Sequence, residues 1–291
     1  MQHTKEKMYM GKGGMAMVKT YEELELKDDF MFSVIMRDPR YVKPFLETIL
    51  RIKIAKIEYP EVQKNIDIAA GAKGIRLDVY VEDEKHTVFN LEMQTTTARN
   101  LPKRMRYYQG MIDLNILEKG DDYNHLKKSY VIFVCTFDPF GLGRHIYTFE
   151  NRCSEDIALT LNDGTVKIIL NTKGTLDDVS PEMKRLLDYV DGKGVSDTFT
   201  RDLEEAVQSA RQNEKWRLDY MTLQQEYRER FQEGKVEGIK EGKIEGLREG
   251  KIVGKIETLY EELHMTVAEI AEKLVISEEE VQKIVDALEN A

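Results

Sequence analysis

The chain has 291 residues, of which 41% are hydrophobic, and a formal net charge of -10. This composition predicts a globular core, and the negative charge disfavours nonspecific attraction of the whole surface to nucleic acid or to anionic membranes. Since the chain has neither an apolar run of about 18 residues nor a secretory signal segment, we expect a soluble, cytoplasmic protein that does not enter a membrane.

The first half of the chain predicts an α/β fold. Residues 1–20, rich in Met, Gly and Lys, are expected to form a mobile leader. Apolar residues recur at helical intervals in 28–50, where Pro39 separates two helices. Three strands, a helix and a buried strand are expected next, at 65–70, 75–81, 87–94, 101–118 and 129–137. The order helix, strand, strand, strand, helix, strand predicts a mixed sheet, the αβββαβ arrangement.

The second half predicts a β-containing extension and then helices. Asp163 and Gly164 lie between two apolar runs, which is a hairpin signal. A helix is expected after this extension, with Ser180 as its N-cap and Pro181 at its first position. A long polar helix is expected within the segment 196–232, and its first residue is expected at about position 198.

A glycine occupies every fourth position from Gly234 to Gly254, within the segment 233–256. In a helix this stripe drifts by about 40° per glycine, and each glycine costs about 1 kcal/mol relative to alanine. The stripe is therefore a poor coiled-coil seam. We favour a semi-flexible helical spacer, and self-association through close approach at the small residues stays open as the alternative.

The last segment, 257–291, predicts two short helices in a helix-turn-helix-like tail. Thr266 is expected to cap the first helix, and Ser277, with Glu280, the second. Their shared core is expected to contain Ile270, Ala271, Leu274, Ile276, Val281 and Ile284. Three acids at the start of the second helix disfavour contact with DNA phosphates. A packing or protein-interaction module is the favoured interpretation.

Strand parity identifies a candidate site. The apolar residues of 75–81 and 87–94 are odd-numbered, so burying both sets on one face requires an antiparallel hairpin with an even sum of paired residue numbers. A three-residue loop within EDEK, residues 82–85, satisfies this condition. The even-numbered residues must then share the opposite face: Arg76, Asp78, Tyr80, Asn90, Glu92 and Gln94.

Two carboxylates, Asp78 and Glu92, converge in this arrangement. They repel each other unless a cation lies between them, and oxygen ligands with several waters suit Mg²⁺. Such a metal binds a phosphate oxygen and activates an attacking water, which Gln94 on the same face can hold. The alternative is that these side chains merely line a solvated face of the sheet.

A set of motifs carries a family resemblance: KDDFMF, RLDVYV, FNLEMQ, KRMRYYQGMID, YTFENRCSED, LNDGT and LNTKG. From about residue 20 to the glycine repeat, the chain resembles the recombination-promoting nuclease (Rpn) family, the transposases of the PD-(D/E)XK nuclease superfamily. The resemblance implies a restriction-endonuclease-like core and a metal-dependent DNA endonuclease associated with recombination or mobile elements.

Carried over by position, the resemblance makes Asp78 and Glu92 the ligands of Mg²⁺ or Mn²⁺, with the backbone carbonyl of Met93 as a further ligand. Gln94 takes the place of the motif's lysine. Asp29 matches an acidic residue near the metal, although Asp28 beside it is an alternative.

The sequence departs from the motif at two positions. Leu77 stands where the superfamily name has proline, and the proline only shapes the strand. Gln94 orients water but supplies no positive charge to the phosphate, so slow turnover is expected.

A basic segment, 99–108, follows the candidate site and contains no acid. Its DNA-contact candidates are Arg99, Lys103, Arg104, Arg106 and Tyr107, with Tyr108 as the alternative to Tyr107. The competing interpretation is that Tyr107 and Met111 belong to the core and that the basic side chains are solvated.

The sequence therefore predicts a metal-dependent DNA endonuclease with a nuclease-like domain at 21–195 and a helical tail that offers a route to homo-oligomers. A catalytically weak or inactive DNA-binding or scaffold protein is the main alternative. An adaptor that oligomerises through its tail is the third.

Overall fold

The computed structural model describes residues 19–58, 61–66, 75–97 and 100–289. The chain divides into two compact units, Met1–Tyr220 and Met221–Ala291. Residues 1–18 of the predicted leader lie outside the described residues. Among the helices in the described part of the chain, none is long and apolar enough to cross a lipid bilayer.

The first unit begins with two helices that meet at Pro39. α1 spans Asp29–Met36 and α2 spans Pro39–Leu50. The Asp38 carboxylate accepts a hydrogen bond from the Arg40 amide at 2.9 Å. Proline fits the first helical position because no amide donor is needed there. The predicted break between the two helices is confirmed.

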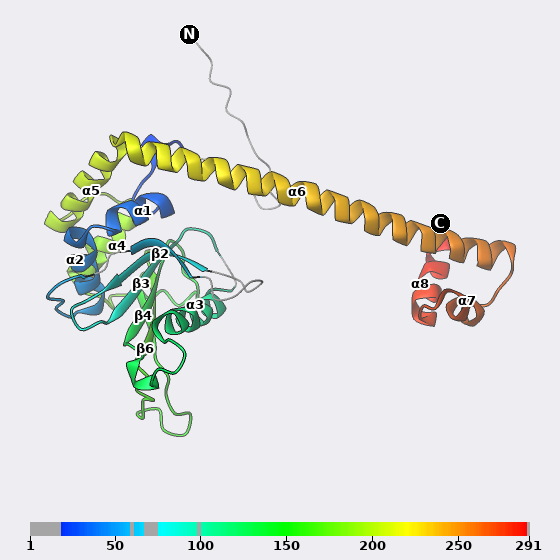
Figure 1. Cartoon of the computed structure of the whole chain (residues 1–291), viewed down its shortest axis with the longest axis horizontal. Helices are drawn as coiled ribbons and strands as arrows, with labels where there is room; N and C mark the ends of the chain where they lie inside the picture. The colour runs from blue at the N-terminus through cyan, green and yellow to red at the C-terminus, as the bar shows by residue number, and fades with distance from the viewer. Residues whose placement is uncertain (1–18, 59–60, 67–74, 98–99, 290–291) are drawn as a thin grey trace, which may run out of the picture. The chain divides into compact units, whose positions relative to one another are not determined.

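A mixed sheet forms the centre of this unit, with the strand order β1-β2-β3-β4-β6-β5 among the described residues (Figure 1). The strands are β1 (Glu61–Ile66), β2 (Ile75–Glu82), β3 (Val88–Gln94), β4 (Ser129–Cys135), β5 (Ile146–Phe149) and β6 (Thr165–Asn171). β3, β4 and β6 are parallel, whereas the other neighbouring pairs are antiparallel. With α3 (Leu101–Ile116) between β3 and β4, the predicted order of elements is confirmed.

The predicted limits of the first strand, 65–70, are wrong at the N-terminal end. β1 begins at Glu61, because its backbone pairs with β2 from Glu61 opposite Tyr80 to Ile66 opposite Ile75. Residues 67–70 lie outside the described residues.

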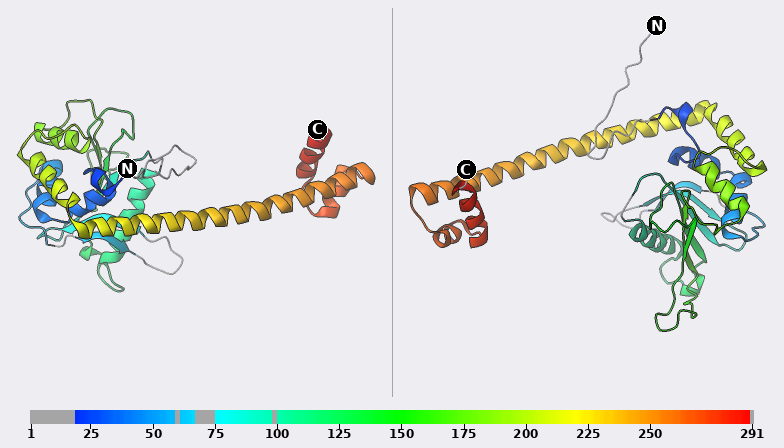
Figure 2. Two further views of the ribbon diagram at one scale, coloured as in Figure 1. Left: turned by 90° about the horizontal axis from the view of Figure 1, so that it is seen from above. Right: turned by 180° about the vertical axis from the view of Figure 1, so that it is seen from behind.

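The sheet separates two hydrophobic clusters, and helices cover both of its faces. Val79 and Leu91 lie on the face that packs against α1, α2, α4 (Pro181–Val190) and α5 (Thr198–Arg211). On the other face, Met105 of α3 packs with Phe133 of β4. Figures 1 and 2 show α3 on the opposite side of the sheet from the other helices of this unit. The start of α4 is as predicted, since the Ser180 hydroxyl accepts a hydrogen bond from an amide of its first turn.

The hairpin predicted at Asp163 and Gly164 is wrong. β6 does begin after Gly164, but its antiparallel partner is β5, and the preceding apolar run leaves Leu159 and Leu161 exposed. The Asp163 carboxylate accepts a hydrogen bond from the Thr165 amide at 3.0 Å, and Gly164 has a φ of 77°. Asp163 and Gly164 therefore do form a turn. The pairing partner was misassigned because it lies further away in the sequence.

The single polar helix predicted at 196–232 is also wrong. α5 ends at Arg211, and α6 (Glu214–Glu257) starts a new helix. The Asn213 side chain accepts a hydrogen bond from the Trp216 amide at 3.2 Å and thereby caps this helix. α6 continues through every glycine of the repeat, so the repeat is helical.

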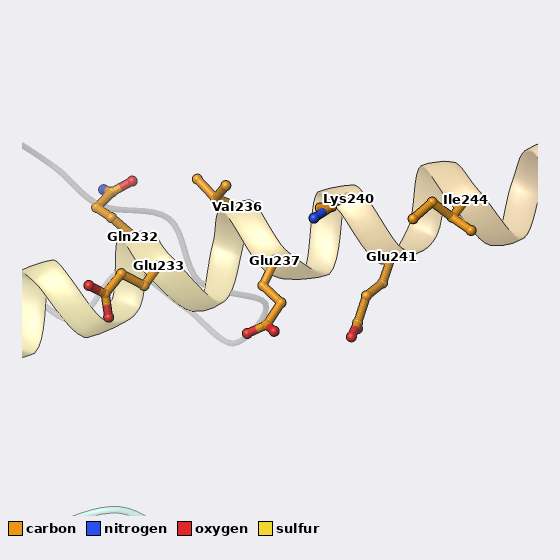
Figure 3. A pocket seen from close by; sticks show the side chains of 7 residues that line it. All are labelled: Gln232, Glu233, Val236, Glu237, Lys240, Glu241 and Ile244. Atoms are coloured by element: carbon orange, nitrogen blue, oxygen red, sulfur yellow. The ribbon is translucent and has the colours of Figure 1, made fainter.

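A shallow hollow lies along α6, and all of its described lining residues come from this helix (Figure 3). The lining side chains are Gln232, Glu233, Val236, Glu237, Lys240, Glu241 and Ile244. The three glutamates extend to one side of the helix in Figure 3. Since one helix supplies the whole described lining, the hollow does not enclose a small molecule.

The second unit ends in the two predicted helices, α7 (Val267–Leu274) and α8 (Glu278–Glu289). Thr266 caps α7 in a capping box with Glu269, and the Ser277 hydroxyl accepts a hydrogen bond from the Glu280 amide at 3.2 Å. The buried core consists of Ile256, Leu259, Ile270, Ala271, Val281 and Val285. The predicted members Leu274, Ile276 and Ile284 are only partly buried, because Ile256 and Leu259 of the preceding helical segment fill the centre.

Candidate active site

β2 and β3 form an antiparallel hairpin with the predicted parity. Val79 lies opposite Leu91, so paired residue numbers have a constant even sum. The Asp83 amide donates a hydrogen bond to the Thr87 carbonyl at 3.1 Å, which leaves a three-residue turn at 84–86. This turn extends one residue beyond the predicted EDEK segment.

The two carboxylates lie where the pairing of these strands ends. Beyond the pair of Val79 and Leu91, side chains replace the ladder of backbone hydrogen bonds. The Asp78 amide donates to Oε1 of Glu92 at 3.1 Å, and the Met93 amide donates to Oδ2 of Asp78 at 3.1 Å. Each carboxylate is thus anchored to the backbone of the neighbouring strand.

The irregularity also changes one predicted core position. Leu77 was expected to share a face with Val79 and Val81, but it belongs to the hydrophobic cluster beneath α3. The alternation along β2 therefore breaks at Asp78, the residue at which β2 and β3 stop pairing.

The face that carries Glu92 is buried rather than solvated. Asn90, Glu92 and Gln94 are exposed by 0%, 2% and 8%. The cluster under α3 covers this side of the sheet, so the interpretation as a solvated face is wrong. Neither polar side-chain atom of Asn90 has a hydrogen-bonding partner of normal geometry among the described residues.

Glu92 is electrostatically strained by this environment. Burial raises the pKa of Glu92 well above its usual value, and the negative charge of Asp78 raises it further. The Asp78 amide, the nearby Asn90 amide group and the charge of Arg104 oppose this rise of the Glu92 pKa without cancelling it. A cation bound between the carboxylates would favour their charged forms.

Gln94 is held at both ends of its amide. Its Nε2 donates to the Met93 carbonyl at 2.7 Å, and its Oε1 accepts a hydrogen bond from Nη1 of Arg104 at 2.6 Å. Arg104 also donates to the Tyr108 hydroxyl at 3.1 Å. The glutamine is consequently a fixed group rather than a mobile one.

Asp28 and Asp29 have different environments, which bears on the choice between them. Asp28 pairs with Lys19 at 2.7 Å and accepts a hydrogen bond from the Glu25 amide at 2.7 Å. Partial loss of hydration beside the protein raises the pKa of Asp29, and the charge of Asp28 raises it further, whereas the charge of Arg104 opposes this rise. The Asp29 side chain is still reached by solvent. Of these two aspartates, Asp29 is the one whose pKa the charge of Arg104 affects.

The residues of the basic segment have different environments. Arg99 lies outside the described residues, whereas Lys103, Arg106 and Tyr107 are exposed on the helix. The exposure of Tyr107 contradicts its assignment to the core, although Met111 is buried as that interpretation expected.

Arg104, by contrast, turns toward the carboxylate site. The basic run in the sequence groups Arg104 with the DNA-contact candidates and does not predict its contact with Gln94. One local signal was available, because Arg104 and Tyr108 are four residues apart and therefore lie on one face of a helix. The pairing of that face with β3 is a tertiary contact.

The donor set fits a divalent metal of the Mg²⁺ type. Asp78 and Glu92 would hold the ion through hard carboxylate oxygens. No third His, Cys, Asp or Glu joins them in a metal-binding group among the residues that the structure describes, so waters would complete the coordination. The Met93 carbonyl accepts the Gln94 hydrogen bond and has a second lone pair.

Comparisons with known proteins give a family for this part of the chain. No curated protein and no solved structure matches the sequence. A family model matches residues 29–152, which include α1, the strands β1 to β4, α3 and the carboxylate pair. The matched model is that of the PD-(D/E)XK nuclease family transposases, and it covers less than half of the chain.

Proposed function

We propose that the protein is a metal-dependent DNA endonuclease that hydrolyses phosphodiester bonds. The observation that carries this proposal is the pair of Asp78 and Glu92. Each carboxylate accepts a hydrogen bond from the backbone of the other's strand, where β2 and β3 stop pairing. The raised pKa of the buried Glu92 supports it, because a bound cation would relieve that strain.

In the proposed mechanism, Asp78 and Glu92 would hold Mg²⁺ or Mn²⁺, with the Met93 carbonyl as a further ligand. When bound, the metal polarises the phosphate and activates a water for attack on phosphorus. Gln94 orients that water through the hydrogen-bonding capacity left on its fixed amide. Asp29 contributes a further acidic group on the side of Arg104. Attack forms a new P–O bond as the water loses a proton to solvent, and the bond to one of the two ester oxygens breaks as that oxygen takes up a proton from solvent.

The surface of α3 is the proposed contact for DNA. Lys103 and Arg106 are exposed and form no ion pair with a carboxylate of the described residues. Basic side chains at a surface bind phosphates and release counterions, which suits a local site on a protein of overall negative charge. Tyr107, also exposed, is positioned to pack on sugar or base. Arg99 stays a predicted contact.

A catalytically weak or inactive DNA-binding or scaffold protein is the second candidate. Both ends of the Gln94 amide are engaged and its side chain is almost fully buried, which favours this candidate over a fast enzyme. The helical tail is proposed as a spacer, with homo-oligomerisation through it as the alternative.

Nicking of supercoiled plasmid by the purified protein tests the proposal, with Mg²⁺, Mn²⁺ or EDTA. We expect metal-dependent nicking by the wild type and its loss in Asp78→Ala. Asp202→Ala removes an exposed carboxylate of α5 and serves as the matched control, with unchanged nicking expected. Equal activity of wild type and Asp78→Ala, or no cleavage with any metal, would favour the binding or scaffold candidate.

A further inference from the structure

Arg104 is held in place beside the carboxylate site. Its two terminal nitrogens donate to Gln94 at 2.6 Å and to the Tyr108 hydroxyl at 3.1 Å. Its guanidinium carbon lies 5.3 Å from the centre of the Phe133 ring and 5.5 Å from that of Tyr108. The side chain is therefore oriented by hydrogen bonds and aromatic contacts together.

The charge of Arg104 acts on the site without being neutralised by a direct ion pair. Its hydrogen bond to Gln94 places the guanidinium beside a residue that lies two positions after Glu92 on β3. Among the described residues, however, no carboxylate forms a salt bridge with it. A clamp that served only the fold would gain most from pairing directly with a buried acid, because an unpaired charge next to the core is costly.

Arg104 keeps the donors that an anion needs. A guanidinium carries five N–H groups, and the two hydrogen bonds to Gln94 and Tyr108 use two of them. The remaining donors suit a phosphate, which arginine binds with charge-assisted and often bidentate geometry. Gln94 is neutral, so any positive charge that the protein adds to that of the proposed metal has to come from another element.

We propose that Arg104 is the cationic catalytic residue of this site: it contacts the phosphate that is cleaved and fixes the Gln94 amide. The inference rests on the proposed nuclease function and deepens it. The charge comes from α3 and the amide from β3, so the pair acts as one unit across two elements.

Exchange of the two groups tests the inference. Single-turnover nicking at saturating protein is measured for Arg104→Gln, Arg104→Lys and the double variant Gln94→Lys with Arg104→Gln. We expect Arg104→Gln to lower the rate by roughly 10²-fold, Arg104→Lys to lower it less, and the double variant to recover about tenfold because it restores a cation at the pair.

Controls separate a charge role from a merely structural one. Arg201→Gln removes an exposed arginine of α5 and is expected to leave the rate unchanged. Thermal unfolding reports whether each variant folds. Equal losses in Arg104→Gln and Arg104→Lys, with no recovery in the double variant, would overturn the inference and leave Arg104 a structural clamp.

DNA binding in Ca²⁺ tests the same contact without cleavage. The affinity for a short duplex is measured against salt concentration by fluorescence anisotropy. Arg104→Gln should reduce the slope of log Kd against log salt by about one, and Arg201→Gln should not. An unchanged slope overturns the inference whether or not the protein cleaves. A reduced slope without wild-type cleavage overturns the nuclease function and the catalytic role of Arg104 and leaves only its phosphate contact, and no binding by the wild type overturns both proposals.

Discussion

The Asp78 amide donates a hydrogen bond to the Glu92 carboxylate across 3.1 Å, directly beyond the residues at which β2 and β3 stop pairing. The reciprocal bond from the Met93 amide holds the Asp78 carboxylate in the same gap. Two carboxyl groups are thereby fixed close together inside a covered sheet. The backbone of both strands holds them in place.

The first prediction concerns the stability of the metal-free protein against pH. The folded-state pKa of Glu92 is raised, so the folded protein holds a proton that the unfolded chain releases above about pH 4.3. Stability should therefore fall as pH rises from that value toward the folded-state pKa. Glu92→Gln keeps an acceptor for the Asp78 amide without the charge, so it should become more stable than the wild type as pH rises. Urea unfolding in EDTA at several pH values measures this.

Metal addition provides the control for this prediction. Mg²⁺ or Mn²⁺ should stabilise the wild type by binding the folded state, and should stabilise Glu92→Gln much less. A stability difference between the two proteins that does not change with pH would contradict the assignment of the strain to Glu92.

The second prediction concerns Gly174, which lies against the ring of His145. A Cβ at this position would meet ring atoms at 2.5 Å, and His145 is buried with its Nδ1 at 2.9 Å from Asp178. Gly174→Ala should therefore destabilise the first unit by about 1–3 kcal/mol, because the core cannot move aside cheaply. Chemical denaturation measures the loss.

Gly110 offers the matched comparison for this change. It lies within α3 and has open space at its Cβ position, so Gly110→Ala should stabilise the protein by up to about 1 kcal/mol. Equal effects of the two substitutions would show that the His145 contact does not matter.

The third prediction separates the two roles of the glycine repeat. Open space surrounds the Cβ positions of Gly238, Gly242 and Gly246. Replacing all three with alanine should therefore stabilise the helix by about 1 kcal/mol for each glycine. A spacer should keep its oligomeric state, as measured by sedimentation, whereas self-association through close helix approach should weaken. Weaker association of the alanine variant would favour the self-association role.

The fourth prediction concerns the exposed basic residues of α3. Lys103→Ala and Arg106→Ala should each weaken DNA binding and reduce the slope of log Kd against log salt by about one, because each residue releases about one counterion. Anisotropy titrations at several salt concentrations measure both quantities, with Lys215→Ala of α6 as the control. Unchanged slopes in both variants would remove α3 from the DNA-binding surface.

Local sequence patterns were enough to predict the elements and helix ends that depend on neighbouring residues. Alternation identified β2 and β3, and the parity of their apolar residues predicted the even-sum register that the pair of Val79 and Leu91 confirms. The parity argument also brought Asp78 to Glu92, although the alternation along β2 breaks at Asp78. Capping residues such as Ser180 and Thr266 marked helix starts, since a cap bonds amides within its own first turn.

The surroundings of these elements came from the structure. It showed that α3 buries the face carrying Glu92 and that β5, not the segment before Asp163, pairs with β6. It also brought Arg104 to Gln94. These outcomes depend on contacts between elements that lie apart in the chain, and neither alternation nor helical periodicity specifies which face meets which. Local chemistry therefore fixed the carboxylates, and long-range packing fixed the cation beside them.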